Sequence, residues 1–208
     1  MPCYVLDVLY ISKDDTLAVS SVQGIIIINL KRKQITRTIS INSEIDGITL
    51  MENKLIYSGR NDGIRMINLD DESITQIVQD KMPRHCYIAT FRNQIYHTNS
   101  ETHAVTCYDQ QGKPQWTFKN ESLLKYPRGI DVDMDGNVYV VGFKSHNLVV
   151  ISPDGQRHRE VLAASDGLDR PFSLCFDNSK KQLLVANYNN EAHLYTFILK
   201  DFAIVYQF

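Results

Sequence analysis

The sequence predicts an all-β fold built from a repeated unit of four strands. A run of apolar residues that ends in small or polar ones recurs five times, at steps of 38, 40, 43 and 45 residues; the runs begin at Leu17, Leu55, Ile95, Val138 and Leu183. A second apolar strand follows each run after a short turn, at steps of 39, 41, 43 and 46 residues. Because the two series drift together, they indicate one structural repeat.

Each unit also has an earlier and a later strand. The earlier strands read VLDVLY, GITLM, CYIATF, GIDVD and FSLCF, and the later ones read TRTISI, TQIVQ, QWTF, REVL and AIVYQF. Asp-Gly pairs at Asp135 and Asp154 suit the tight turns of hairpins. Helical periodicity is nowhere sustained over ten residues. The order within a unit is therefore strand, turn, strand, loop, strand, turn, strand.

Such a unit predicts a β-propeller. A single four-stranded sheet leaves both faces open to water, and radial stacking of sheets buries those faces. Strand repeats of about 40 residues are typical of propellers. We expect a single domain over residues 1–208, with units at 1–43, 44–85, 86–128, 129–171 and 172–208. The GIDVD-type strands should be innermost and the AIVYQF-type strands outermost.

Composition narrows the classes of function. The chain of 208 residues has a net charge of −2, so it lacks the overall basic field that favours nucleic acid or acidic membranes. No apolar run approaches the length of a membrane span, and the N-terminus does not resemble a signal peptide. None of the four cysteines forms a C-x-x-C pair; three lie in apolar runs, at Cys86, Cys107 and Cys175. We expect buried free thiols, which fits a reducing, cytoplasmic location.

One segment carries a family resemblance. Residues 126–156 read YPRGIDVDMDGNVYVVGFKSHNLVVISPDGQ and resemble an NHL repeat. The matching features are Pro-x-Gly-Ile at Pro127, Asp-Gly-Asn at Asp135, a Tyr-Val strand at Tyr139, His-Asn at His146 and Asp-Gly at Asp154. The fifth unit keeps Pro171 and its strand core, whereas units one to three keep the strand rhythm alone.

The style of this segment resembles the C-terminal NHL region of animal tripartite-motif proteins. That resemblance implies a propeller that captures a protein substrate or RNA, while RING, B-box and coiled-coil regions supply ubiquitin-ligase activity. No zinc-ligand array or heptad run for those regions is present in the sequence. NHL propellers usually have six blades, so we expect five units of a six-bladed ring with a gap between units one and five. A closed five-bladed ring is the alternative.

Motifs for catalysis are weak. DVDMDGN at Asp131 matches the start of a calcium loop, but position twelve, which needs a bidentate Glu, is Gly142, and we interpret the segment as a hairpin. The six histidines do not recur at one repeat position, and neither a nucleophile elbow nor a Gly-rich phosphate loop is present. We therefore expect no enzyme, no cofactor, no metal and no small-molecule substrate. A propeller metalloenzyme of the lactonase or lyase type remains the alternative.

The basic residues indicate a binding function more strongly than any motif indicates catalysis. Arg84, Arg128 and Arg170 precede inner strands, and second-to-third-strand loops carry Arg60, Lys144 and His146. In a propeller both kinds of connection open onto one face, so we predict that these six residues form a binding face. They could instead be ordinary solvated loop charges. We expect protein–protein recognition, with single-stranded RNA as the alternative, because charge alternates between units and four aromatics lie near these residues: Tyr126, Phe143, Phe172 and Tyr188.

Overall fold

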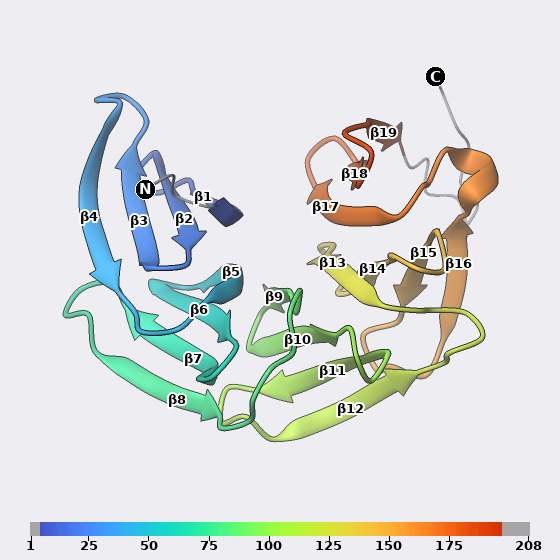
Figure 1. Cartoon of the computed structure of the whole chain (residues 1–208), viewed down its shortest axis with the longest axis horizontal. Coiled ribbons are helices and arrows are strands. Elements are labelled where there is room, and N and C mark those ends of the chain that lie inside the picture. The colour runs from blue at the N-terminus through green and yellow to red at the C-terminus, as the bar shows by residue number, and fades with distance from the viewer. Residues whose placement is uncertain (1–4, 197–208) are drawn as a thin grey trace.

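The computed structural model describes residues 5–196 and confirms the all-β prediction (Figure 1). Within these residues the regular elements are 19 strands and one short 3-10 turn at Ala164–Asp166. None of the described residues forms a helix long and apolar enough to cross a membrane.

The strands form five antiparallel sheets, one for each predicted unit. The first blade contains β1 (Val5–Ile11), β2 (Thr16–Ser21), β3 (Gly24–Asn29) and β4 (Gln34–Ser40). The second contains β5 (Ile45–Met51), β6 (Lys54–Gly59), β7 (Gly63–Asn68) and β8 (Ile74–Val78). The third contains β9 (Ile88–Phe91), β10 (Gln94–Asn99), β11 (Ala104–Asp109) and β12 (Pro114–Lys119). The fourth contains β13 (Pro127–Val132), β14 (Val138–Gly142), β15 (Asn147–Ile151) and β16 (His158–Leu162). The fifth contains β17 (Pro171–Asp177), β18 (Gln182–Asn187) and β19 (Ala192–Thr196); its expected fourth strand, AIVYQF, lies outside the described residues.

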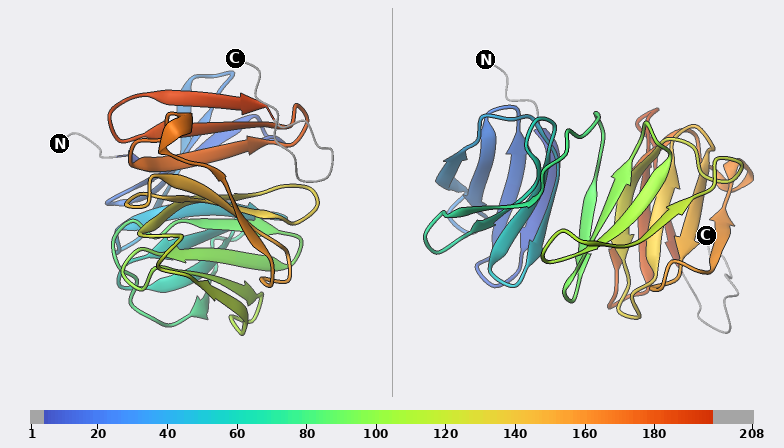
Figure 2. Two further views of the ribbon diagram at one scale, coloured as in Figure 1. Left: turned by 90° about the vertical axis from the view of Figure 1, so that its right-hand side faces the viewer. Right: turned by 90° about the horizontal axis from the view of Figure 1, so that it is seen from below.

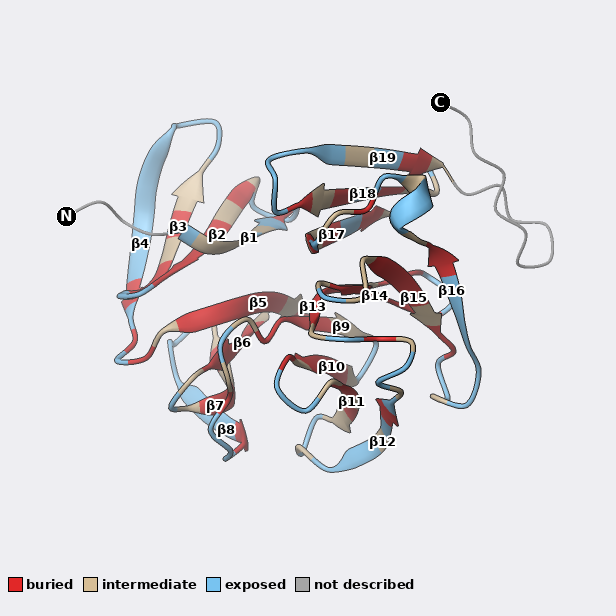
Figure 3. Ribbon diagram, turned by 45° about the vertical axis from the view of Figure 1, so that its right-hand side comes forward, coloured by how far each residue is buried: buried red, intermediate tan, exposed pale blue. Residues whose placement is uncertain are grey.

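The sheets lie face to face around a common centre, as in a β-propeller (Figures 1 and 2). The first strand of each blade is innermost, and the inner strands β1, β5, β9, β13 and β17 pack against one another in chain order. The outer strands β4, β8, β12 and β16 face solvent, whereas the inner strands β5 and β13 are largely buried (Figure 3). The first and fifth blades stand apart, so the described blades form an open arc (Figure 1).

Hydrophobic cores fill the spaces between neighbouring blades. Ile25 of the first blade and Leu55 of the second belong to one cluster, and Tyr96 of the third and Val140 of the fourth belong to another. All four side chains are fully buried. The stability of the arc therefore comes from blade-to-blade packing, as expected for a repeat architecture.

Glycine in the Pro-x-Gly-Ile segment has a packing role. A Cβ at Gly129 of β13 would lie 2.7 Å from the Cα of Ser173 in β17. Gly47 of β5 meets Tyr87, just before β9, in a similar way at 2.9 Å. The absence of a side chain at these two positions lets consecutive inner segments approach backbone to backbone.

The first and fifth blades, at the two ends of the arc, each expose apolar side chains on the face that no other described blade covers. Val8 and Tyr10 of β1 are 52% and 54% exposed. On the fifth blade Cys175, Leu184 and Leu194 pair in one register, and all three are exposed. The expectation that the cysteines in apolar runs are buried is thus wrong for Cys175, because no neighbouring blade covers its face in the described structure. Cys86 and Cys107, which lie between blades, are buried.

The calcium-like segment is a hairpin turn. One oxygen of Asp133 accepts the N–H groups of Asp135 and Asn137, at 2.9 Å each, and the other accepts the Asn137 side-chain amide and the Tyr139 hydroxyl. Gly136 adopts φ = 86°, a left-handed conformation that favours glycine. The carboxylate is thus committed to the turn that joins β13 and β14.

Candidate functional site

The residues of the predicted binding face lie at the same end of the blades. Arg60 follows β6, Lys144 and His146 lie between β14 and β15, and Arg84 and Arg170 precede inner strands. Arg128 differs from the prediction: it is the second residue of β13 and is 8% exposed, so it is not a solvated loop charge. The extended backbone of the strand holds it beside the centre of the arc.

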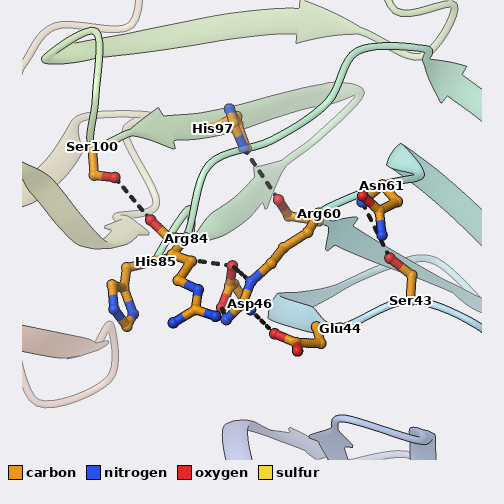
Figure 4. Close-up of polar contacts among 10 residues, drawn as sticks. Ser43, Glu44, Asp46, Arg60, Asn61, Arg84, His85, His97 and Ser100 are labelled. Carbon is orange, nitrogen blue, oxygen red and sulfur yellow. Dashed lines mark hydrogen bonds and ion pairs between the residues drawn. The ribbon is translucent and has the colours of Figure 1, made fainter.

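Asp46 organises the part of this face between the second and third blades (Figure 4). Its buried carboxylate accepts two hydrogen bonds from the Arg60 guanidinium, each at 3.3 Å, and a third from the backbone N–H of His85 at 3.1 Å. Arg60 also pairs with Glu44. Arg60 is therefore fixed by two carboxylates of its own blade and is not free to bind a partner.

Electrostatics couple this cluster across blades. Burial raises the pKa of the Asp46 carboxyl to about 6, although the His85 N–H and the charges of Arg84 and Arg128 favour its ionised form. Burial lowers the pKa of His85 to about 4, and the positive charges of Arg128, Arg60 and Arg84 act in the same direction. At neutral pH His85 is therefore a neutral ring among three cations.

Two aromatic rings enclose Arg128. Its guanidinium carbon lies 3.7 Å from the centre of the Phe143 ring and 4.5 Å from that of Phe172. Phe172 also makes edge contacts with His85 and Tyr87 of the third blade, with ring centres 5.6 and 5.8 Å apart. Residues of three blades thus converge on one arginine.

The aromatic contacts continue onto the fifth blade. Phe143 meets Tyr188 edge-on, with ring centres 5.8 Å apart, and Arg170 lies over Tyr188 at 5.3 Å. The Lys144 ammonium lies 3.6 Å from the centre of the Tyr126 ring. Each of the four aromatics near the predicted basic residues therefore touches one of the cations.

His146 has a structural task, which it shares with His103. The Nδ1 atom of His103 accepts the backbone N–H of Tyr126 at 3.0 Å, and that of His146 accepts the N–H of Arg170 at 3.2 Å. The expectation that no histidines recur at one repeat position is wrong for this pair. Nδ1 of His146 also lies 3.3 Å from the Asp169 carboxylate.

A repeated backbone feature explains this pairing. His85, Tyr126 and Arg170 each precede an inner strand and have φ of 62°, 52° and 48°. The N–H of each is bonded by a side chain of the preceding blade, namely Asp46, His103 or His146. The left-handed conformation turns this N–H toward the preceding blade. The site residues are therefore held by hydrogen bonds between neighbouring blades.

Sequence reasoning missed Asp46, His85 and Tyr87 as members of this face. Asp46 directly precedes Gly47, and Arg128 directly precedes Gly129, so the two occupy matched positions of the inner strands. Alignment of the inner strands on these glycines could have found Asp46. The described residues contain no cluster of histidine, cysteine, aspartate and glutamate suited to a metal ion. Chemically, the arrangement presents positively charged side chains that pack on aromatic rings.

No protein-family model matches the chain, and no curated protein matches it in sequence. Solved structures do match. A chain in the crystal structure of a nidogen/laminin complex is 18% identical, with a TM-score of 0.71 over 92% of this chain and 79% of that one. A chain in the mitotic checkpoint complex is 12% identical, with a TM-score of 0.71 over 94% of this chain and 62% of that one.

Virginiamycin B lyase from Staphylococcus aureus is 20% identical, with a TM-score of 0.67 over 94% of this chain and 71% of that one. Similarity at these identities shows a shared fold. The chain is thus an assembly of five β-propeller blades, and its distinguishing feature is a cationic and aromatic face that spans blades two to five.

Proposed function

We propose that this chain is a non-catalytic module that recognises a protein partner through the face bearing Arg84, Arg128 and Arg170. The observation that carries the proposal is the continuous set of cation–aromatic contacts on that face. Aromatic and arginine side chains are enriched at protein interfaces and supply most of their binding energy. Loops on rigid sheets can present such groups without a catalytic constellation.

Two further points support a protein partner. The net charge of −2 gives no general attraction for phosphate backbones. Two of the similar folds occur in crystal structures of protein complexes, nidogen/laminin and the mitotic checkpoint complex. We extend the proposal, on the NHL resemblance of the fourth blade, to substrate recognition for a cytoplasmic ubiquitin ligase of the tripartite-motif type.

Single-stranded RNA is the second candidate. Tyr188 is 59% exposed and lies under Arg170, an arrangement that suits a stacked base next to a phosphate. RNA binding would show a steep salt dependence and would be lost after nuclease treatment. Protein recognition would survive nuclease.

The test is affinity capture from cell lysate, with and without nuclease, using three proteins. These are the wild-type chain, the double variant Arg84→Glu, Arg170→Glu, and a control with Lys31→Glu and Lys33→Glu. The two arginines are exposed, so reversing their charge should spare the fold; the two lysines are exposed in the β3–β4 turn at the opposite end of the blades. The proposal predicts nuclease-resistant partners that the arginine variant loses and the lysine variant keeps. Equal recovery by both variants would show that this face is not the binding site.

A further inference from the structure

The Arg128 guanidinium is rigidly placed. It projects from the inner strand β13, and the rings of Phe143 and Phe172 cover it. With 8% of its surface exposed, the side chain has little freedom to turn toward solvent. An arginine held in this way has already lost its rotamer entropy before any ligand arrives.

Yet Arg128 has no polar partner in the described part of the chain. Its Nε is buried and makes no hydrogen bond. The two Nη groups make none either, but they are not fully buried. A buried donor without a partner is costly, and an arginine so deeply placed is normally paired. The structure thus contains a preformed cation whose hydrogen bonds are unmade.

The nearby carboxylate cannot fill this role. Asp46 influences Arg128 through its charge, but its oxygens are bonded by Arg60 and by the N–H of His85. The other carboxylate of the cluster, Glu44, is paired with Arg60. Within this cluster the guanidiniums of Arg60, Arg84 and Arg128 outnumber the carboxylates of Asp46 and Glu44 by one.

We propose that Arg128 is the receptor for a carboxylate from an acidic side chain of the partner, bound end-on through the free Nη groups and flanked by Arg84. This inference rests on the proposed function and specifies the partner's chemistry. A carboxylate carries one negative charge, which matches the excess, and its two oxygens match the planar guanidinium fork. A phosphate carries nearly two charges at neutral pH and would leave the cluster overcompensated.

The test uses the 208-residue chain labelled with ¹⁵N and three peptides capped at both ends. The peptides read Ala-Ala-Xaa-Ala-Ala, where Xaa is Glu, Gln or phosphoserine. The readout is the Nε–H resonance of Arg128, which its absence in Arg128→Lys identifies. Lysine keeps the charge but lacks the fork, so the substitution also tests geometry.

We expect the Glu peptide to shift the resonance saturably and the Gln peptide to leave it unchanged. Arg128→Lys should weaken binding of the Glu peptide, followed by backbone resonances near Arg84, by at least about tenfold, since a charge-assisted hydrogen bond contributes that much. The control variant Lys31→Glu, Lys33→Glu should bind as wild type does. If Arg128→Lys fails to fold, the peptide series on the wild-type chain decides the matter alone.

Three results would overturn the inference: equal shifts with Glu and Gln, no shift with any peptide, or tighter binding of phosphoserine than of Glu. The last would assign the site to phosphate. If the Glu peptide fails while Arg84→Glu, Arg170→Glu still loses captured partners, the proposed function stands and the inference is wrong. If the Glu peptide binds while the variant keeps every partner, the carboxylate site stands and the proposed function is wrong.

Discussion

The Arg128 guanidinium lies against the Phe143 ring, 3.7 Å from its centre, yet makes no hydrogen bond within residues 5–196. Arginine on an aromatic face is a common packing arrangement, but the polar edge of the guanidinium is usually bonded. This pair therefore separates two roles of one residue: its faces serve packing, and its edge is available for binding.

The first prediction follows from that separation. Arg128→Met should leave the free energy of unfolding within about 1 kcal/mol of wild type, because the apolar stem remains and an unpartnered donor is removed. Urea unfolding followed by tryptophan fluorescence measures it. A loss of more than about 3 kcal/mol, typical of breaking a buried ion pair, would mean that Arg128 has a structural partner and is not held for a ligand.

The second prediction concerns pH. Burial lowers the pKa of His97 to about 4, below its ordinary value of 6.5, and the ring lies 3.2 Å from the Ser58 hydroxyl. A base with a depressed pKa contributes stability that is present above pH 6.5 and is lost as the pH falls toward 4. His97→Gln should therefore reduce the loss of stability between pH 7 and pH 4.5 by on the order of 2 kcal/mol. If the free energy of unfolding falls equally with pH in wild type and His97→Gln across that range, His97 does not have this role.

The third prediction tests the open arc. Leu184 and Leu194 are 45% and 58% exposed on the fifth blade, whereas the adjacent Leu183 is fully buried. Leu184→Thr and Leu194→Thr should each change the free energy of unfolding by less than about 1 kcal/mol, and Leu183→Ala should cost about 2–5 kcal/mol. Thermal unfolding of the three variants measures this. Comparable costs at Leu184 and Leu183 would show that another part of the protein covers the face.

The fourth prediction concerns metal dependence. As a binding module, the chain should keep its unfolding midpoint in a strong chelator, and elemental analysis should find no stoichiometric zinc or calcium. A drop of many degrees on chelation would favour the metalloenzyme alternative. So would metal-dependent lyase or hydrolase activity of the purified chain.

The fold could be predicted because its signals are local. Strand patterns near Leu55 and Val138 recur at nearly constant steps, and turns such as Asp135-Gly136 carry their own chemistry. The common face of the basic residues followed from topology alone, since both kinds of connection leave a blade at one end. These inferences needed no knowledge of how one blade packs on the next.

What the sequence left open depends on contacts between blades. Arg128 looked like a loop charge, but the rings of Phe143 and Phe172 bury it, and the latter lies 44 positions further along the chain. The histidines looked scattered because the spacing of His103 and His146 is visible as a repeat only once their backbone partners are known. Exposure of Cys175 likewise depends on which blades pack against the fifth one among residues 5–196, not on its own apolar run.

The recognition surface is tested most directly by a hydrogen-exchange footprint of a captured, nuclease-resistant partner on the wild-type chain. We predict slower exchange in the segments that form the cationic and aromatic face: 83–88, 125–130, 142–147 and 168–174. We predict unchanged exchange in the turns at the opposite end, such as residues 30–34 and 110–113. Protection confined to those opposite turns, or to the exposed apolar strands of the first and fifth blades, would show that this face is not the recognition surface.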